Sequence, residues 1–188
     1  MTTTQTEPRE MIRNGVNVTK LAGTIRAIER QPELAQFKFR ARNRWDTGAH
    51  NVATVDTFHG TCQEIRHKNP FVMHADEPPV LLGQDNGANP VEFVLAGLSG
   101  CMTTTLAYHA AGRGHTIESI ESEYEGDIDL HGLLDLDPEV RPGYREIRVK
   151  VKVKGDADEE TIRELLRKSP VYDTLLNPVK IKIDVEKV

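Results

Sequence analysis

The segment from Asn89 to Gly114 constrains the fold more than any other part of this 188-residue chain. Asn89 is suited to cap a helix, Pro90 to the first helical position, and Gly114 to the position after the last turn. Between these signals the sequence is mostly apolar and rich in small residues that let neighbouring elements approach closely. It predicts one helix to about Arg113, about 36 Å long, which is enough to cross a small domain. We expect a buried central helix.

Segments on both sides of this helix alternate apolar and polar residues with a period of two, which is typical of half-buried strands. Strands are therefore expected over residues 37–45, 52–58, 71–73, 117–130, 147–153 and 181–185. The first of them would carry a basic outer face. A short helix capped by Asp156 or Asp158 is expected to run through Lys168, where Ser169-Pro170 ends it. This order of elements predicts an α+β fold with mainly antiparallel sheets around a long central helix.

The N-terminal part differs from the rest of the chain. Residues 1–16 are polar, lack the pattern of a signal peptide, and are expected to be disordered. Asn17 can cap a helix over residues 18–30. We therefore divide the chain into a polar tail and helical extension over residues 1–36 and a main domain over residues 37–188.

Composition narrows the classes of function. The chain holds 24 Lys and Arg against 29 Asp and Glu, a net charge of −5, which is a poor match for a nucleic-acid-binding protein. No apolar run approaches the ~20 residues that span a bilayer. We therefore predict a cytoplasmic protein without a nucleic-acid or membrane partner. The two cysteines, Cys62 and Cys101, are then more typical of free or redox-active thiols than of a structural disulfide.

Charged residues form stripes along the expected strands. Acidic residues over 123–129 precede basic residues over 148–154, with one loop between them. An antiparallel pair would set these opposite charges face to face. The pattern favours a solvated charge ladder over a site for an anion or a nucleic acid.

Cys101 lies in the middle of the expected central helix. A buried cysteine there can act as a small hydrophobic residue, whereas a reactive thiol needs a cation or hydrogen-bond donor from another element. Near Cys62 the sequence has four histidines, His50, His59, His67 and His74. Their spacing lacks a complete set of metal ligands, so we expect no metal and no cofactor. A metal site, or another thiol chemistry at Cys62, stays open as a third hypothesis.

The segments Asn89–Leu95 and Leu98–Cys101 resemble the OsmC/Ohr family, in which an Asn-Pro-Glu helix start precedes a cysteine on the central helix. The resemblance covers about residues 37–188. Further matches are Asp76–Pro78, His109–Gly114, Gly126–Gly132 and Ser169–Tyr172. It implies an OsmC-like fold, an intertwined homodimer, and a thiol peroxidase that acts on organic hydroperoxides at the dimer interface.

The resemblance also implies a chemistry. In that family a reactive cysteine attacks the peroxide O–O bond and becomes a sulfenic acid, with which a second cysteine forms a disulfide. A dithiol reductant restores both thiols. An arginine, held by a glutamate, stabilises the thiolate. Cys101 matches the reactive cysteine.

The sequence departs from the family pattern at three positions. Ser169 stands where the second cysteine would precede Pro-Val. Val91 follows Asn-Pro, with Glu92 immediately after it, and His50 stands at the position of the arginine. The resemblance therefore implies a subgroup without the second cysteine.

Two main functions follow. The first is a thiol-dependent organic hydroperoxide reductase in oxidative stress defence, with Cys101 as nucleophile and His50 or a nearby arginine stabilising its thiolate. Glu92 would support the site, and Cys62 or an external thiol or dithiol would resolve the oxidised cysteine. The second is a non-catalytic protein that binds a small apolar ligand on the same homodimeric scaffold. The replacement of the second cysteine by Ser169 motivates this alternative.

Overall fold

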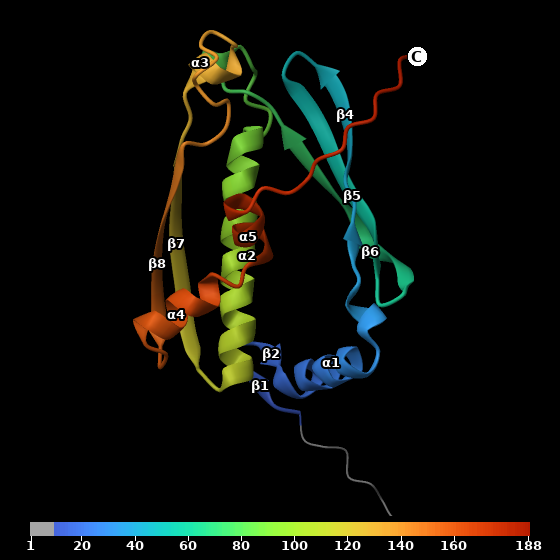
Figure 1. Ribbon diagram of the computed structural model, residues 1–188, viewed down its shortest axis with the longest axis vertical. Coiled ribbons are helices and arrows are strands. Elements are labelled where there is room, and N and C mark those ends of the chain that lie inside the picture. The colour runs from blue at the N-terminus through green and yellow to red at the C-terminus, as the bar shows by residue number, and fades with distance from the viewer. Residues whose placement is uncertain (1–9) are drawn as a thin grey trace, which may run out of the picture. The chain divides into compact units, whose positions relative to one another are not determined.

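The computed structural model describes residues 10–188. The chain divides into two compact units, Met1–Val94 and Leu95–Val188. The described strands pair in antiparallel fashion within each unit, and helices accompany them (Figure 1). The predicted α+β class is confirmed.

A four-stranded antiparallel sheet dominates the first unit. Its strand β5 (His50–Gly60) pairs with β3 (Lys38–Phe39), β4 (Arg42–Thr47) and β6 (Gln63–Ala75). The turn between β5 and β6 is only two residues long, and β6 pairs with β5 from Gly60 back to Asn51. The start of β5 therefore lies beside the end of β6.

The predicted strand over 37–45 is wrong in one respect, because it is broken between β3 and β4. Phe39 pairs with Phe58, whereas Arg42 pairs with Thr54. Between these two pairs the β3–β4 segment covers three residues, whereas β5 covers four. Such a shift in register moves the following side chains to the other face of the sheet. Arg42 now lies on the same face as Phe39. The expected continuous basic face is therefore absent.

The N-terminal helix is confirmed as α1 (Val18–Arg30), with Asn17 Oδ1 accepting a hydrogen bond from the backbone N–H of Lys20 at 2.9 Å. The predicted disorder is wrong for residues 10–16, and its remainder lies outside the described residues. A hairpin turns at Asn14-Gly15, where both residues have positive φ, a turn sequence that favours hairpins. The short elements of this unit are β1 (Ile12–Arg13), β2 (Val16–Asn17), η1 (Pro32–Ala35) and η2 (Pro79–Leu81).

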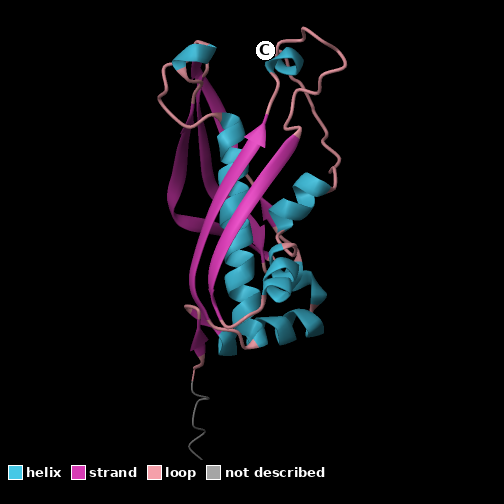
Figure 2. Cartoon of the chain, turned by 90° about the vertical axis from the view of Figure 1, so that its left-hand side faces the viewer, coloured by secondary structure: helices cyan, strands magenta, loops and turns pink. Residues whose placement is uncertain are grey.

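The predicted central helix is confirmed as α2 (Pro90–Arg113). Leu98, Met102, Leu106 and Ala110 form a buried stripe with a spacing of four residues. In the second unit this stripe packs against α4 (Glu159–Leu166) and against the hairpin of β7 (Ile117–Asp127) and β8 (Glu146–Gly155). Figure 2 shows this hairpin lying across the helix.

The burial of α2 is narrower than expected. Its buried residues are this stripe and Ala111, whereas the large side chains of Val91 and Tyr108 are exposed. Among residues 10–188, α2 is also the one helix whose length and composition would suffice to cross a membrane. The expectation that no apolar run approaches that length is therefore wrong, although its core stripe packs against protein.

The predicted charge ladder on β7 and β8 is confirmed. Glu123 pairs with Lys150, and Glu125 pairs with Arg148. The Arg148 guanidinium donates hydrogen bonds to both Asp127 and Glu125, which raises the pKa of Arg148. Arg148, Lys150 and Lys154 of the basic stripe each form an ion pair with an acidic side chain on the solvent side.

The last part of the chain differs from prediction. The helices α3 (Leu130–Leu133) and α5 (Pro170–Leu176) were not expected. The expected strand over 181–185 is not formed, and Ile181, Ile183 and Val185 are 78%, 80% and 88% exposed. An alternating strand is stable only when a sheet edge pairs with it. The described residues of this chain provide no such pairing.

Candidate functional site

The start of α2 is held by a reciprocal cap. Asn89 Oδ1 accepts a hydrogen bond from the backbone N–H of Val91 at 3.0 Å, and Glu92 accepts one from the backbone N–H of Asn89 at 2.9 Å. The Glu92 contact is that of a capping box, and Asn89 is an N-cap whose oxygen accepts from the second residue of the helix. The Glu92 carboxylate therefore stabilises the start of the helix. The polar contacts of His50 are with Asp46 and His74, not with Glu92.

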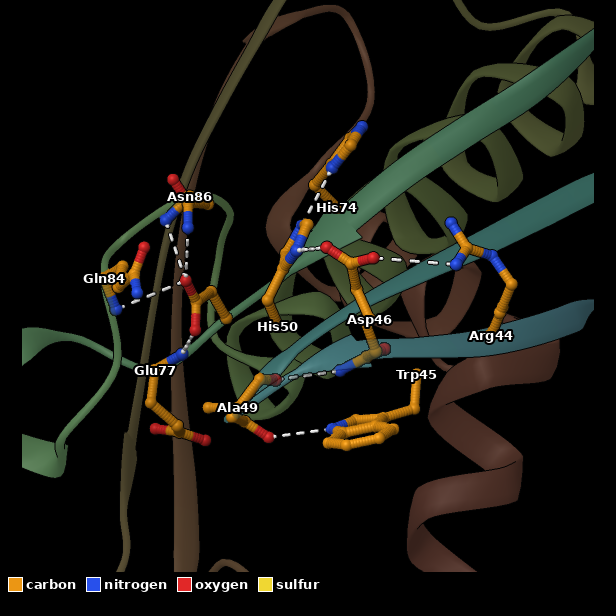
Figure 3. Close-up of polar contacts among 12 residues, drawn as sticks. Arg44, Trp45, Asp46, Ala49, His50, His74, Glu77, Gln84 and Asn86 are labelled. Atoms are coloured by element: carbon orange, nitrogen blue, oxygen red, sulfur yellow. Dashed lines mark hydrogen bonds and ion pairs between the residues drawn. The ribbon is translucent and has the colours of Figure 1, made fainter.

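A chain of polar contacts, which we call the Asp46–His50–His74 chain, connects the ends of β4 and β6 with the start of β5 (Figure 3). Asp46 Oδ2 lies 3.1 Å from His50 Nδ1, and His50 Nε2 lies 3.0 Å from His74 Nδ1. The two imidazole rings stack with their centroids 5.3 Å apart. Behind them, Arg44 Nη1 lies 3.5 Å from Asp46. The His50 side chain is only 15% exposed.

The Asp46 carboxylate determines which nitrogen donates and which accepts in each contact of the Asp46–His50–His74 chain. Asp46 has no proton to give when ionised, so His50 donates from Nδ1 and accepts at Nε2. His74 must then donate from its own Nδ1, which leaves its Nε2 at the outer end of the chain. When one further proton is bound, the two rings carry a positive charge that faces the Asp46 carboxylate. The two rings can therefore carry a positive charge or donate a proton.

A tight loop after β6 fixes the backbone at His74. Asp76 is almost fully buried and accepts hydrogen bonds from the backbone N–H groups of Glu77, Gln84 and Asn86 (Figure 3). Burial raises the pKa of Asp76, but these hydrogen bonds outweigh it and lower the pKa overall. A Cβ on Gly87 would lie 2.1 Å from the carbonyl oxygen of His74. This close approach requires glycine.

Cys101 lies on α2 in the second unit, beside the buried stripe. Its residue is half-buried, whereas the next residue, Met102, is buried. Met102 also lines an open groove of about 500 Å³. The walls of the groove are Val149, Val151 and Val153 of β8 with Ile162, Arg163 and Leu166 of α4. Cys101 does not line this groove, but as a half-buried residue it is not sealed within the core.

Ser169 performs a structural task. It is fully buried, and its Oγ accepts a hydrogen bond from the backbone N–H of Tyr172 at 3.3 Å. It is the N-cap of α5, with Pro170 at the first helical position. The residue at the position of the family's second cysteine therefore satisfies a helix end.

Replacing Ser169 with alanine is expected to lower the free energy of unfolding by about 1 kcal/mol, because the N-cap hydrogen bond is lost. Denaturant unfolding at a fixed protein concentration measures the change. Ser99→Ala is the matched control, since Ser99 is half-buried within α2 and caps no helix end. A cost for Ser169→Ala no larger than that for Ser99→Ala would contradict the assigned role.

Cys62 lies away from the Asp46–His50–His74 chain. It is exposed in the β5–β6 turn, at the opposite end of β5 from His50. An 11-residue strand separates its ends by about 33 Å. Within residues 10–188 no three His, Cys, Asp or Glu side chains are placed to hold a metal ion. The structure does not unite Cys62 and the four histidines in one site.

Asp46 and His74 were missed as site residues. They flank His50 by 4 and 24 positions in the sequence, and only the register of the β5–β6 hairpin brings His74 across. The sequence signal that could have placed His74 near His50 was the pair of strands expected over 52–58 and 71–73. The length of the hairpin that joins them could not be read from it.

Comparison with known proteins places this geometry in context. The family model described as OsmC-like protein matches residues 83–184. No curated protein matches the chain. An OsmC like protein from Mycoplasma pneumoniae has a TM-score of 0.56 and 18% identity, over 75% of this chain and 89% of that one. A protein from Psychrobacter arcticus 273-4, described as an osmotic stress induced and detoxification response protein, has a TM-score of 0.53 and 14% identity, over 71% and 85%. Likeness at these identities shows a shared fold.

Proposed function

Because the chain belongs to the OsmC-like protein family, we propose that it is a thiol-dependent organic hydroperoxide reductase with Cys101 as the nucleophile. The observation that carries the proposal is the half-buried, free Cys101 on α2, within the segment that the family model matches. The resemblance of this segment to the OsmC/Ohr family supplies the reaction class. The description of the Psychrobacter protein adds an association with stress and detoxification.

The first step is the oxidation of Cys101. Its thiolate sulfur attacks the terminal oxygen of the hydroperoxide, an S–O bond forms, and the O–O bond breaks. Sulfur is oxidised to a sulfenic acid, and the peroxide leaves as an alkoxide that takes up a proton to become an alcohol. We assign the charge that stabilises the thiolate to His50, which stands at the arginine position of the family pattern. Its contacts with Asp46 and His74 support that role.

The second step is the return of Cys101 to the thiol. Ser169 cannot form a disulfide, and Cys62 lies at the far end of β5 from His50. An external thiol therefore condenses with the sulfenic acid, releasing water and leaving a mixed disulfide. A second thiol group, from the same dithiol or another molecule, then displaces Cys101. The reductant is oxidised and the enzyme is reduced.

The partner that we propose is a second copy of the chain, in a cytoplasmic homodimer without nucleic-acid or membrane partners. The exposed apolar surface of α2 and the unpaired alternating residues over 181–185 support it. Large apolar side chains left exposed on one chain are often covered by association with a partner. A homodimer would cover both without the need for another protein.

Sustained peroxide consumption is expected only when an external dithiol is added, and Cys62→Ser is expected to keep the wild-type rate. The measurement follows an organic hydroperoxide in excess over protein, with and without dithiothreitol. Without the dithiol, consumption should stop after about one equivalent, because one thiol is oxidised once. Many turnovers without added thiol, or a loss of turnover in Cys62→Ser alone, would overturn this scheme.

A further inference from the structure

We propose that the groove between β8 and α4 is a binding site for a carboxylate with one unbranched apolar chain, such as a medium-chain fatty acid. The groove lies entirely within the second unit and has a volume of about 500 Å³, which is within the range of small-molecule sites. Cys101 does not line it. The inference therefore goes beyond the proposed function and stands independently of it.

The walls of the groove are apolar and elongated. The three valines over residues 149–153 alternate along β8 and so project to one side of the hairpin, over a length of about 14 Å. Ile162 and Leu166 line the groove from successive turns of α4. Met102 and Leu166 are only 6% and 9% exposed, so the groove borders the buried core. An elongated apolar surface of this kind suits an extended hydrocarbon chain.

Two cationic side chains lie on the rim of the groove. Arg163 and Arg167 line it from the C-terminal part of α4, four residues apart, and both are exposed. The neighbouring carboxylate of Glu164 is held by Arg113 and Lys168 instead. Within the part of the chain that the structure describes, neither Arg163 nor Arg167 forms an ion pair. Both guanidinium groups are therefore available to an anionic ligand.

The single carboxylate in the lining does not cancel this charge. Among the described residues that line the groove, Glu159 is the only acidic one. It lies in the first turn of α4, where a carboxylate complements the partial positive charge of the helix start. The two arginines lie toward the other end of the helix, so the rim there is positively charged. This charge favours a ligand with an anionic head group.

The walls and the rim together identify the class of ligand. A guanidinium matches a carboxylate with two parallel hydrogen bonds, whereas the side chains of the valines offer no hydrogen bond. A wholly polar anion would leave the apolar walls in water, and a wholly apolar ligand would gain nothing from the arginines. A single acyl chain that ends in a carboxylate uses both features. A groove of this volume suits one such chain rather than the two chains of a phospholipid.

Titration calorimetry with decanoate and 1-decanol, which share a chain but not a charge, tests the site on the full protein. Arg163→Gln combined with Arg167→Gln is expected to weaken decanoate binding by about tenfold, because two charge-assisted contacts on an exposed rim are lost. The binding of 1-decanol should stay as in the wild type. The matched control is Arg26→Gln combined with Arg30→Gln, since these arginines are also exposed and four residues apart, on α1. It should change neither affinity.

A substitution in the wall tests the apolar part of the site. Val149 lines the groove and is 38% exposed. Val149→Gln is expected to weaken both ligands by about threefold, because apolar contact with the chain is lost. An effect on decanoate alone would contradict the role of the valines.

The remaining outcomes are equally decisive. No saturable binding of decanoate, or an equal weakening of decanoate and 1-decanol by the paired change of Arg163 and Arg167, would overturn the proposal. A dimer, measured by light scattering, that binds neither ligand and dissociates in Val149→Gln would assign the groove to a second copy of the chain. Neither ligand contains a peroxide bond, so the result is separate from the reductase activity. Cys101→Ser should bind decanoate with the wild-type affinity, and a loss of binding would contradict the independence of the site.

Discussion

Truncating Leu106 to alanine is expected to lower the free energy of unfolding by about 3 to 4 kcal/mol. Leu106 is fully buried at the centre of the stripe on α2, between β7–β8 and α4. Its removal takes apolar surface from the core and leaves a cavity that packed neighbours fill only in part. Denaturant unfolding at one protein concentration gives the change.

Leu134→Ala is the matched control for this truncation. Leu134 is 60% exposed, so its loss should cost little. Equal effects of the two substitutions would show that the stripe on α2 is not the core of the second unit. The comparison uses the same chemical change in both variants and therefore isolates burial.

Replacing Cys101 with serine is expected to lower the rate of hydroperoxide reduction by at least about a thousandfold, which corresponds to about 4 kcal/mol of activation free energy. A serine hydroxyl is not ionised near neutral pH and is a far weaker nucleophile than a thiolate. The oxygen atom of a hydroxyl also cannot be oxidised as sulfur can. The rate of peroxide loss per mole of folded protein measures the effect.

The exposed thiol provides the control for this substitution. Cys62→Ser removes a thiol that is more accessible than Cys101 but lies in a hairpin turn. It should retain the wild-type rate of the first oxidation. The reverse pattern, with Cys62→Ser inactive and Cys101→Ser active, would show that Cys62 is the nucleophile and would contradict the proposal.

Prediction from the sequence succeeded where local signals are strong. The bounds of α2 follow from Asn89, Pro90 and Gly114, because a cap, a fixed φ and a terminating glycine act within a few residues. The pairing of Glu125 with Arg148 follows from complementary charge across one loop. These features depend on neighbours in sequence or on one hairpin.

Prediction failed where the structure depends on register or on a missing partner. The slip between β3 and β4 leaves no trace in the alternating pattern around Arg42. Ser169-Pro170 ends one helix and also begins another, and only the first function was recognised. The alternating residues over 181–185 look like a strand, but no edge pairs with them here. Likewise, His50 could be named from the sequence, whereas its contact with His74 required the fold.

The intact mass of the reduced protein after one equivalent of an organic hydroperoxide tests the central claim most directly. We predict the gain of one oxygen atom, located at Cys101 by trapping the sulfenic acid and sequencing the modified peptide. The gain should persist in Cys62→Ser and be absent in Cys101→Ser. An unmodified Cys101 beside unconsumed hydroperoxide would contradict the assignment of this protein as a thiol peroxidase.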